Sequence, residues 1–255
     1  MLVASWRLTR AAVHGLHGVA IVLWRFPSLD EAAQQRRIAW WAGKMLRVLG
    51  LKLNVHGAFE PGPKLIVANH VSWLDIMALH ALHPEARFVS KAEVREWPVV
   101  RRLADSARTL YLERERRRDA LRVVHQVADA LRSGHTVALF PEGTTGPGDE
   151  MLPFHGNLLQ AAISTGAPVQ PVVLRYADPT TPFTPAATYL GATTLRQTMW
   201  MLVRSRGLAL HVTVLPLHAP GDVSRRELAR RLRERMDEVL APWRERVPGG
   251  DLDSG

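Results

Sequence analysis

A histidine and an aspartate in the segment NHVSWLD (residues 69–75) are the first candidates for chemistry. They follow the apolar run LIVA (residues 65–68), which is typical of a buried strand. Because five residues of a helix correspond to about 140° of rotation, His70 and Asp75 cannot share one helix face. They can meet only if His70 precedes a helix that contains Asp75. The carboxylate would then orient the imidazole and leave one ring nitrogen free as a general base, although such pairs are more often structural.

A segment rich in Gly and Pro, FPEGTTGPGDEMLPF (residues 140–154), follows the predicted strand TVALF (136–140). Gly143 and the glycines after it allow close backbone approach, so their N–H groups could hold a phosphate or an oxyanion. The segment lacks the lysine and the spacing of a nucleotide-binding P-loop. Glu142 is expected at the sheet edge, where it could orient a hydroxyl group or a cation.

Two cations follow other predicted strands. Lys91 comes after RFVS (87–90), and Arg114 comes after TLYLE (109–113). At the same sheet edge as His70, they could converge on a phosphate. The alternative for Arg114 is a solvated charge, since it opens the basic run RERRR (114–118).

Several kinds of chemistry are excluded or disfavoured. The chain has no cysteine, which rules out disulfides and thiol catalysis. It also lacks the G-x-S-x-G and H-E-x-x-H patterns, so direct base-catalysed transfer is favoured over a covalent serine intermediate. The histidine pairs 14/17 and 80/83 have helical spacing but no further ligands that can be placed, so no metal site is expected.

The elements that must position these residues indicate an α/β fold. Between residues 51 and 218, short apolar runs alternate with helical patterns, which predicts a mixed, largely parallel sheet flanked by helices. A C-terminal amphipathic helix is expected within residues 219–247, with Ser224 and Glu227 as a capping box. Residues 248–255 are expected to be a disordered tail.

Residues 1–50 are predicted to form two helices divided at Pro27. Between Arg10 and Arg25 the run AAVHGLHGVAIVLW is shorter than the roughly 20 residues of a membrane span. With tryptophans nearby, a membrane-docking helix in the interface is favoured over an ordinary packing helix.

The charge balance indicates an anionic partner. The chain has 33 Lys and Arg residues against 24 Asp and Glu residues, a formal net charge of +9. Nucleic acid, an anionic membrane surface and a phosphorylated substrate all fit this excess.

Four segments in order, NHVSWLD, TLYLER, FPEGTT and APVQPVVL, resemble the motifs of the glycerolipid acyltransferase family. The resemblance implies transfer of a fatty acyl group from coenzyme A or acyl carrier protein to a lipid hydroxyl, with no other cofactor. It implies His70 as general base and Asp75 as its orienter. Lys91 and Arg114 would hold the acceptor phosphate, and the loop of Glu142, Gly143 and Thr144 would shape the pocket.

Two positions depart from the family pattern. Arg108 stands where the second motif usually has glycine, and Thr145 stands where the third commonly has arginine. The third segment is similar to the branch that includes lyso-ornithine lipid acyltransferases.

The expected reaction is acylation of 1-acylglycerol-3-phosphate to phosphatidic acid, at the cytoplasmic face of the inner membrane, by a peripheral or monotopic enzyme. O-acylation of lyso-ornithine lipid is the alternative within this class. A thioesterase and a non-catalytic basic protein that binds lipid or nucleic acid are the alternatives outside it. The resemblance itself implies no nucleic-acid partner.

Overall fold

The computed structural model describes residues 2–112, 117–191 and 193–246. Within these residues seven strands form one sheet in the order β1-β7-β6-β2-β5-β3-β4. The strands are β1 (Lys52–His56), β2 (Leu65–Ala68), β3 (Arg87–Lys91), β4 (Leu110–Leu112), β5 (Val137–Leu139), β6 (Val169–Ala177) and β7 (Ala209–Val214). Five neighbouring strands, from β6 to β4, are parallel, and β7 joins β6 antiparallel and β1 parallel. The predicted mixed, largely parallel sheet is thus confirmed.

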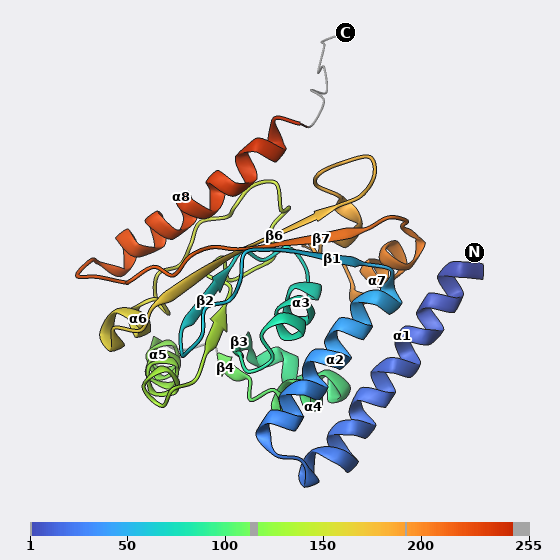
Figure 1. Ribbon diagram of the computed structural model, residues 1–255, viewed down its shortest axis with the longest axis horizontal. Coiled ribbons are helices and arrows are strands. Elements are labelled where there is room, and N and C mark those ends of the chain that lie inside the picture. The colour runs from blue at the N-terminus through green and yellow to red at the C-terminus, as the bar shows by residue number, and fades with distance from the viewer. Residues whose placement is uncertain (1, 113–116, 192, 247–255) are drawn as a thin grey trace.

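Helices cover both faces of this sheet (Figure 1). They are α1 (Leu2–Ala20), α2 (Glu31–Leu49), α3 (Leu74–Leu82), α4 (Pro98–Ser106), α5 (Arg117–Arg132), α6 (Gln160–Thr165), α7 (Leu195–Arg204) and α8 (Arg225–Arg244). Buried residues of α1, α2, α3 and α7 form one core with one face of the sheet. Those of α5, α6 and α8 form a second core with the other face. Both faces are therefore apolar, which explains why the central strands read as continuous hydrophobic runs.

The N-terminal segment forms the predicted pair of helices, which are antiparallel in Figure 1. A π-helical turn (Ile21–Arg25) and a 3-10 turn (Phe26–Ser28) divide them around Pro27. The indole Nε1 of Trp41 donates to the His14 carbonyl at 2.9 Å, and His14 Nε2 lies 3.0 Å from the Trp41 carbonyl. A Cβ on Gly18 would lie 2.4 Å from Trp41 Nε1, so only glycine permits this close contact. At the end of α2, Gly50 has φ 89°, the left-handed conformation of a helix C-cap.

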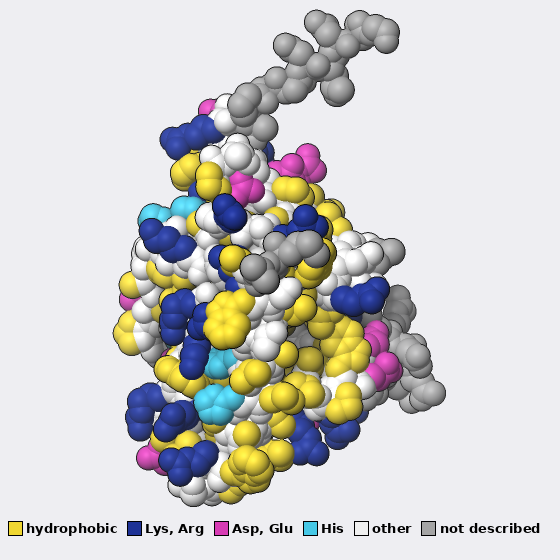
Figure 2. All heavy atoms as spheres, turned by 90° about the vertical axis from the view of Figure 1, so that its right-hand side faces the viewer, with side chains coloured by type: hydrophobic (Ala, Val, Ile, Leu, Met, Phe, Trp, Pro, Cys, Tyr) yellow, Lys and Arg dark blue, Asp and Glu magenta, His cyan; other side chains and the backbone are white. Residues whose placement is uncertain are grey.

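The outer side of α1 and the turn after it carry large apolar side chains that are exposed. More than a third of each is exposed: Val3, Trp6, Val13, Leu16, Leu23 and Trp24. The face turned toward the viewer in Figure 2 shows hydrophobic side chains gathered among Lys and Arg side chains. Within the described ranges, no helix combines the length and the apolar character that crossing a bilayer requires.

The C-terminal helix matches the prediction in part. Ser224 caps α8, since its Oγ accepts the Glu227 N–H at 3.2 Å. The Glu227 carboxylate, which the predicted capping box would turn back toward Ser224, pairs with Arg230 at 2.7 Å and Arg231 at 2.6 Å. The predicted tail, residues 248–255, lies outside the described residues.

Candidate active site

The carboxyl end of β2 is fixed to its neighbour by one side chain. Asn69 Nδ2 donates to the Leu174 carbonyl at 2.9 Å, and the Leu174 N–H donates to Asn69 Oδ1 at 2.7 Å. This pair continues the contact between β2 and β6 one residue beyond the strand. His70 therefore leaves the sheet edge from a rigid position.

His70 and Asp75 meet as the spacing requires, with His70 before α3 and Asp75 in its first turn. His70 Nδ1 lies 2.9 Å from Asp75 Oδ2. The same oxygen accepts the N–H groups of Val71 at 2.7 Å and Ser72 at 2.8 Å. Asp75 is fully buried, and the Tyr176 hydroxyl donates to its Oδ1 at 2.6 Å. Every partner of the carboxylate is thus a donor, and the Nδ1 proton of His70 faces an acceptor.

Tyr176 is a residue of the site that the sequence did not reveal, because it lies 101 residues from Asp75 in the chain. Burial, together with the negative charge of Asp75, raises the pKa of Tyr176 well above its ordinary value. The phenol therefore remains protonated and remains a donor to the carboxylate. No local pattern in APVQPVVLRY marks this tyrosine as part of a site.

The imidazole of His70 is held between the carboxylate and an aromatic ring. It stacks on Phe140, with ring centroids 4.0 Å apart and an interplanar angle of 13°. The side chain is 18% exposed, and among the described residues Nε2 has no hydrogen-bond partner. Since Nδ1 faces Asp75, Nε2 is the nitrogen available to a substrate.

Glu142 is buried next to the backbone of His70, with only 4% of its surface exposed. Its Oε1 accepts the His70 N–H at 2.9 Å, and its Oε2 accepts the Leu152 N–H at 3.2 Å. A backbone hydrogen bond also joins the loop of residues 140–154 to His70, since the Gly146 N–H donates to the His70 carbonyl at 2.7 Å. Burial raises the pKa of Glu142 to about 7. Both oxygens of the Glu142 carboxylate thus accept backbone N–H groups, and the side chain joins the loop to the backbone of His70.

A cleft of about 790 Å³ opens in front of His70. Its lining includes Lys91, Gly143 and Thr144, so three of the predicted binding residues lie at one cavity with the histidine. Arg114 lies outside the described residues. Most of the wall is apolar and comes from the start of α3, the ends of β3, β4 and β5, and the segments around Trp97 and Tyr189. Within the described residues, no group of three or more His, Asp or Glu side chains is placed to hold a metal ion.

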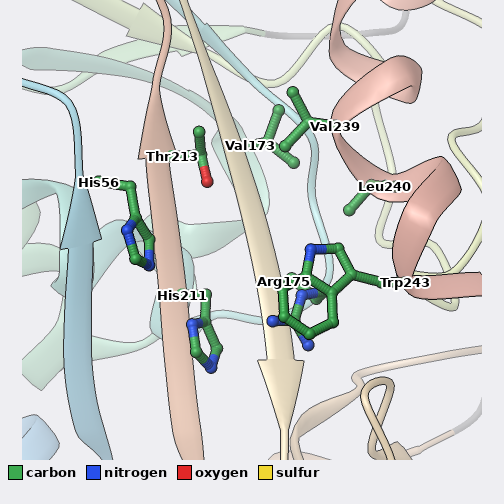
Figure 3. Close-up of a pocket in the computed structure, with 8 residues that line it drawn as sticks. All are labelled: His56, Val173, Arg175, His211, Thr213, Val239, Leu240 and Trp243. Atoms are coloured by element: carbon green, nitrogen blue, oxygen red, sulfur yellow. The ribbon is translucent and has the colours of Figure 1, made fainter. Parts of the chain in front are cut away.

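A second cavity, of about 30 Å³, lies on the α8 side of the sheet (Figure 3). Trp243 of α8 reaches over Arg175 of β6, with the guanidinium carbon 3.7 Å from the ring centroid. Arg175 also donates to the Pro182 carbonyl at 2.7 Å. Its guanidinium is thus engaged in packing, and the cavity has about the volume of one water molecule. It is too small for a lipid headgroup.

The fold and the site together define a class: an α/β protein with a hydrogen-bonded His–Asp pair at the carboxyl edge of its sheet and a large, mostly apolar cleft in front of the histidine. A family model described as Acyltransferase matches residues 52–175. A lyso-ornithine lipid O-acyltransferase of Pseudomonas aeruginosa is 35% identical over 224 residues, which cover 85% of each chain. A 1-acyl-sn-glycerol-3-phosphate acyltransferase of Neisseria meningitidis is 37% identical over 164 residues, 64% of each chain.

A solved structure shares the fold. The crystal structure of the 1-acyl-sn-glycerophosphate acyltransferase PlsC from Thermotoga maritima superposes with a TM-score of 0.66 at 21% identity. The match covers 95% of this chain and 100% of the other. The chain belongs to the glycerolipid acyltransferase family and is an O-acyltransferase. The alternative of a non-catalytic basic protein is therefore wrong.

Proposed function

We propose that this enzyme transfers a fatty acyl group from a thioester to the hydroxyl group of a lysolipid, with His70 as the general base. The observation that carries the proposal is the geometry of His70, whose Nδ1 lies 2.9 Å from the buried Asp75 carboxylate while the ring lines the cleft. Nε2 takes the proton of the lysolipid hydroxyl as its oxygen attacks the thioester carbonyl. The C–S bond then breaks, and the imidazolium returns the proton to the departing thiolate.

The acyl donor is coenzyme A or acyl carrier protein, and the reaction uses no further cofactor. The apolar wall of the cleft supports this proposal, because a fatty acyl chain needs a cavity with a mostly hydrophobic lining. A lining of this kind also limits the access of water to the thioester carbonyl. Transfer to a lipid is therefore favoured over release of the acyl group as free acid.

Two acceptors fit this chemistry. The first is 1-acylglycerol-3-phosphate, which would give phosphatidic acid. It is supported by Lys91 at the cleft and by the name of the Neisseria relative. The second is lyso-ornithine lipid, supported by the name of the Pseudomonas relative, which aligns over 85% of this chain. Thr145, where the family motif commonly has arginine, removes one positive charge from the expected phosphate site.

The enzyme docks on the cytoplasmic face of the inner membrane, as a peripheral or monotopic protein, through α1 and the turn after it. The exposed apolar row of α1 supports this, and the positive net charge of the chain suits an anionic surface. Replacing both Trp6 and Trp24 by serine should lower the fraction of protein that floats with anionic vesicles. Leu121→Ser is the matched control, because Leu121 is 60% exposed but belongs to α5. Equal flotation of both variants and the wild type would exclude α1 and the turn after it as the docking element.

The catalytic proposal is tested with a labelled acyl thioester, each lysolipid in turn, and the His70→Ala variant. The wild type should form the diacyl lipid, and His70→Ala should form it about 10²- to 10⁴-fold more slowly while its unfolding temperature stays close to the wild type. Free fatty acid as the main product would instead indicate the thioesterase. Full activity of His70→Ala would exclude His70 as the base.

A further inference from the structure

The segment from Asn69 to Asp75 is held at both ends by one strand, β6. Asn69 exchanges two hydrogen bonds with the backbone of Leu174. At the other end, Asp75 Oδ1 accepts the Tyr176 hydroxyl at 2.6 Å. Leu174 and Tyr176 alternate with Arg175 along the strand, so their side chains project to the same face of the sheet, and both belong to the core that α3 forms with that face.

The strand gives the Tyr176 hydroxyl a fixed position. β6 continues past its last pairing with β2, at Val172, and pairs with β7 as far as Ala177. Within this stretch Tyr176 lies opposite Leu210, and its carbonyl accepts the Thr184 N–H at 2.9 Å. Because the backbone is held in this way and the residue is only 2% exposed, the phenol has little freedom to leave the carboxylate.

The Asp75 carboxylate depends on donors at both of its oxygens for a single orientation. The torsion about the Cβ–Cγ bond of an aspartate is soft, because it joins a tetrahedral carbon to a planar one. Oδ2 faces His70 Nδ1 at 2.9 Å and accepts the N–H groups of Val71 and Ser72. The phenol on Oδ1 fixes the second oxygen and with it the plane of the group. At 2.6 Å this bond has the length of a charge-assisted hydrogen bond, the stronger kind.

We propose that Tyr176 is a positioning residue for acyl transfer: through Oδ1 it stabilises the negative charge of Asp75 and keeps that carboxylate aligned on His70 Nδ1. This inference rests on the proposed function, because it concerns the base of that same reaction. Asp75 is fully buried, and a buried charge is costly unless donors surround it. The charge that stabilises the imidazolium during proton transfer thus depends on a strand residue 101 positions away in the chain.

The test is Tyr176→Phe, which removes the hydroxyl and keeps the ring. Acyl transfer to each lysolipid should show a kcat about tenfold lower and a KM within about twofold of the wild type, since Tyr176 acts on the base and not on the bound lipid. Tyr111→Phe is the matched control. The Tyr111 hydroxyl also donates to an aspartate, Asp105, at 2.7 Å, but at an exposed position of β4, so its loss should leave kcat unchanged.

A second comparison separates positioning from a loss of structure. Because Tyr176 acts through Asp75 and His70, adding Tyr176→Phe to His70→Ala or to Asp75→Asn should lower kcat by about threefold at most. The Asp75→Asn background contains no buried carboxylate charge that needs the phenol. It therefore tests the inference even if Tyr176→Phe alone does not fold.

The outcomes distinguish this inference from the function on which it rests. An unchanged kcat in folded Tyr176→Phe, a loss confined to KM, or a full tenfold loss in either variant background would overturn the positioning role while acyl transfer itself stands. An equal loss in Tyr111→Phe would also overturn it. If folded wild-type protein forms no diacyl lipid from either lysolipid, the proposed function fails, and the role of Tyr176 fails with it.

Discussion

Replacing Asp75 by asparagine should remove one negative charge and keep the geometry around His70. Oδ2 accepts two backbone N–H groups and faces His70 Nδ1, whereas Oδ1 accepts only the Tyr176 hydroxyl. An asparagine will therefore place its oxygen at the Oδ2 position, because its NH₂ group would otherwise oppose two backbone donors. The Tyr176 hydroxyl can rotate and accept from that NH₂ group. His70 thus keeps its tautomer and loses only the charge that stabilises its protonated form.

The size of the effect follows from that charge. Opposite unit charges about 4 Å apart attract by about 4 kcal/mol at an effective dielectric constant of about 20. If the proton is about half transferred in the transition state, the variant loses about 2 kcal/mol of stabilisation, which corresponds to roughly a 30-fold lower kcat. Asp75→Ala would be a poor substitute. It leaves three buried donors without an acceptor, at a cost of about 1–3 kcal/mol each, and total stability is only about 5–15 kcal/mol.

The assay measures kcat and KM for acyl transfer by wild type, Asp75→Asn, His70→Ala and the double variant, with the thermal unfolding temperature of each. Because Asp75 acts through His70, the double variant should be no slower than His70→Ala alone. A kcat for Asp75→Asn within about threefold of the wild type would refute the role of the charge. A further loss in the double variant would show that Asp75 has a function independent of the histidine.

Three further predictions concern stability. Because burial raises the pKa of Glu142 from 4.5 to about 7, the folded protein holds this proton more tightly than the unfolded chain. Stability should thus fall as the pH rises from about 4.5 to 7, and Glu142→Gln should flatten this slope in unfolding temperatures measured across that range. Gly18→Ala should destabilise the contact between α1 and α2, because the added Cβ would lie 2.4 Å from Trp41. Gly15→Ala adds a Cβ with no atom within 4 Å, so it should stabilise α1 by up to about 1 kcal/mol. The reverse order of the two melting temperatures would contradict this packing. Arg108 has φ 56°, a backbone conformation that is strained for any residue except glycine. Arg108→Gly should therefore be more stable than Arg108→Ala by about 1 kcal/mol in denaturant unfolding. Equal stabilities of the two variants would argue against strain at this position.

Much of the fold was readable from local patterns in the sequence. The alternation of short apolar runs with helical periodicity gave the order of strands and helices, since these patterns depend on neighbours a few residues apart. The same short-range reasoning gave the contact between His70 and Asp75. The break between the first two helices at Pro27 also follows from local chemistry.

Other features depend on contacts between distant parts of the chain, and only the tertiary structure decided them. The pairing of β1 with β7 at the edge of the sheet is one of them. The buried Tyr176 hydroxyl on Asp75 and the Glu142 carboxylate on the His70 N–H join residues 101 and 72 positions apart. The sequence marked Glu142 as a residue of the site, but it could not show that backbone groups occupy both of its oxygens.

The sequence alone therefore brought His70 and Asp75 together and determined the strand end from which His70 projects, because a strand, a turn and a helix start are encoded locally. The structure decided what surrounds His70: the donors that hold Asp75, the aromatic ring that stacks on the imidazole and the apolar wall of the cleft. These neighbours come from separate strands and loops. Their distances are set by how the sheet and its helices pack, which no single segment of the chain specifies.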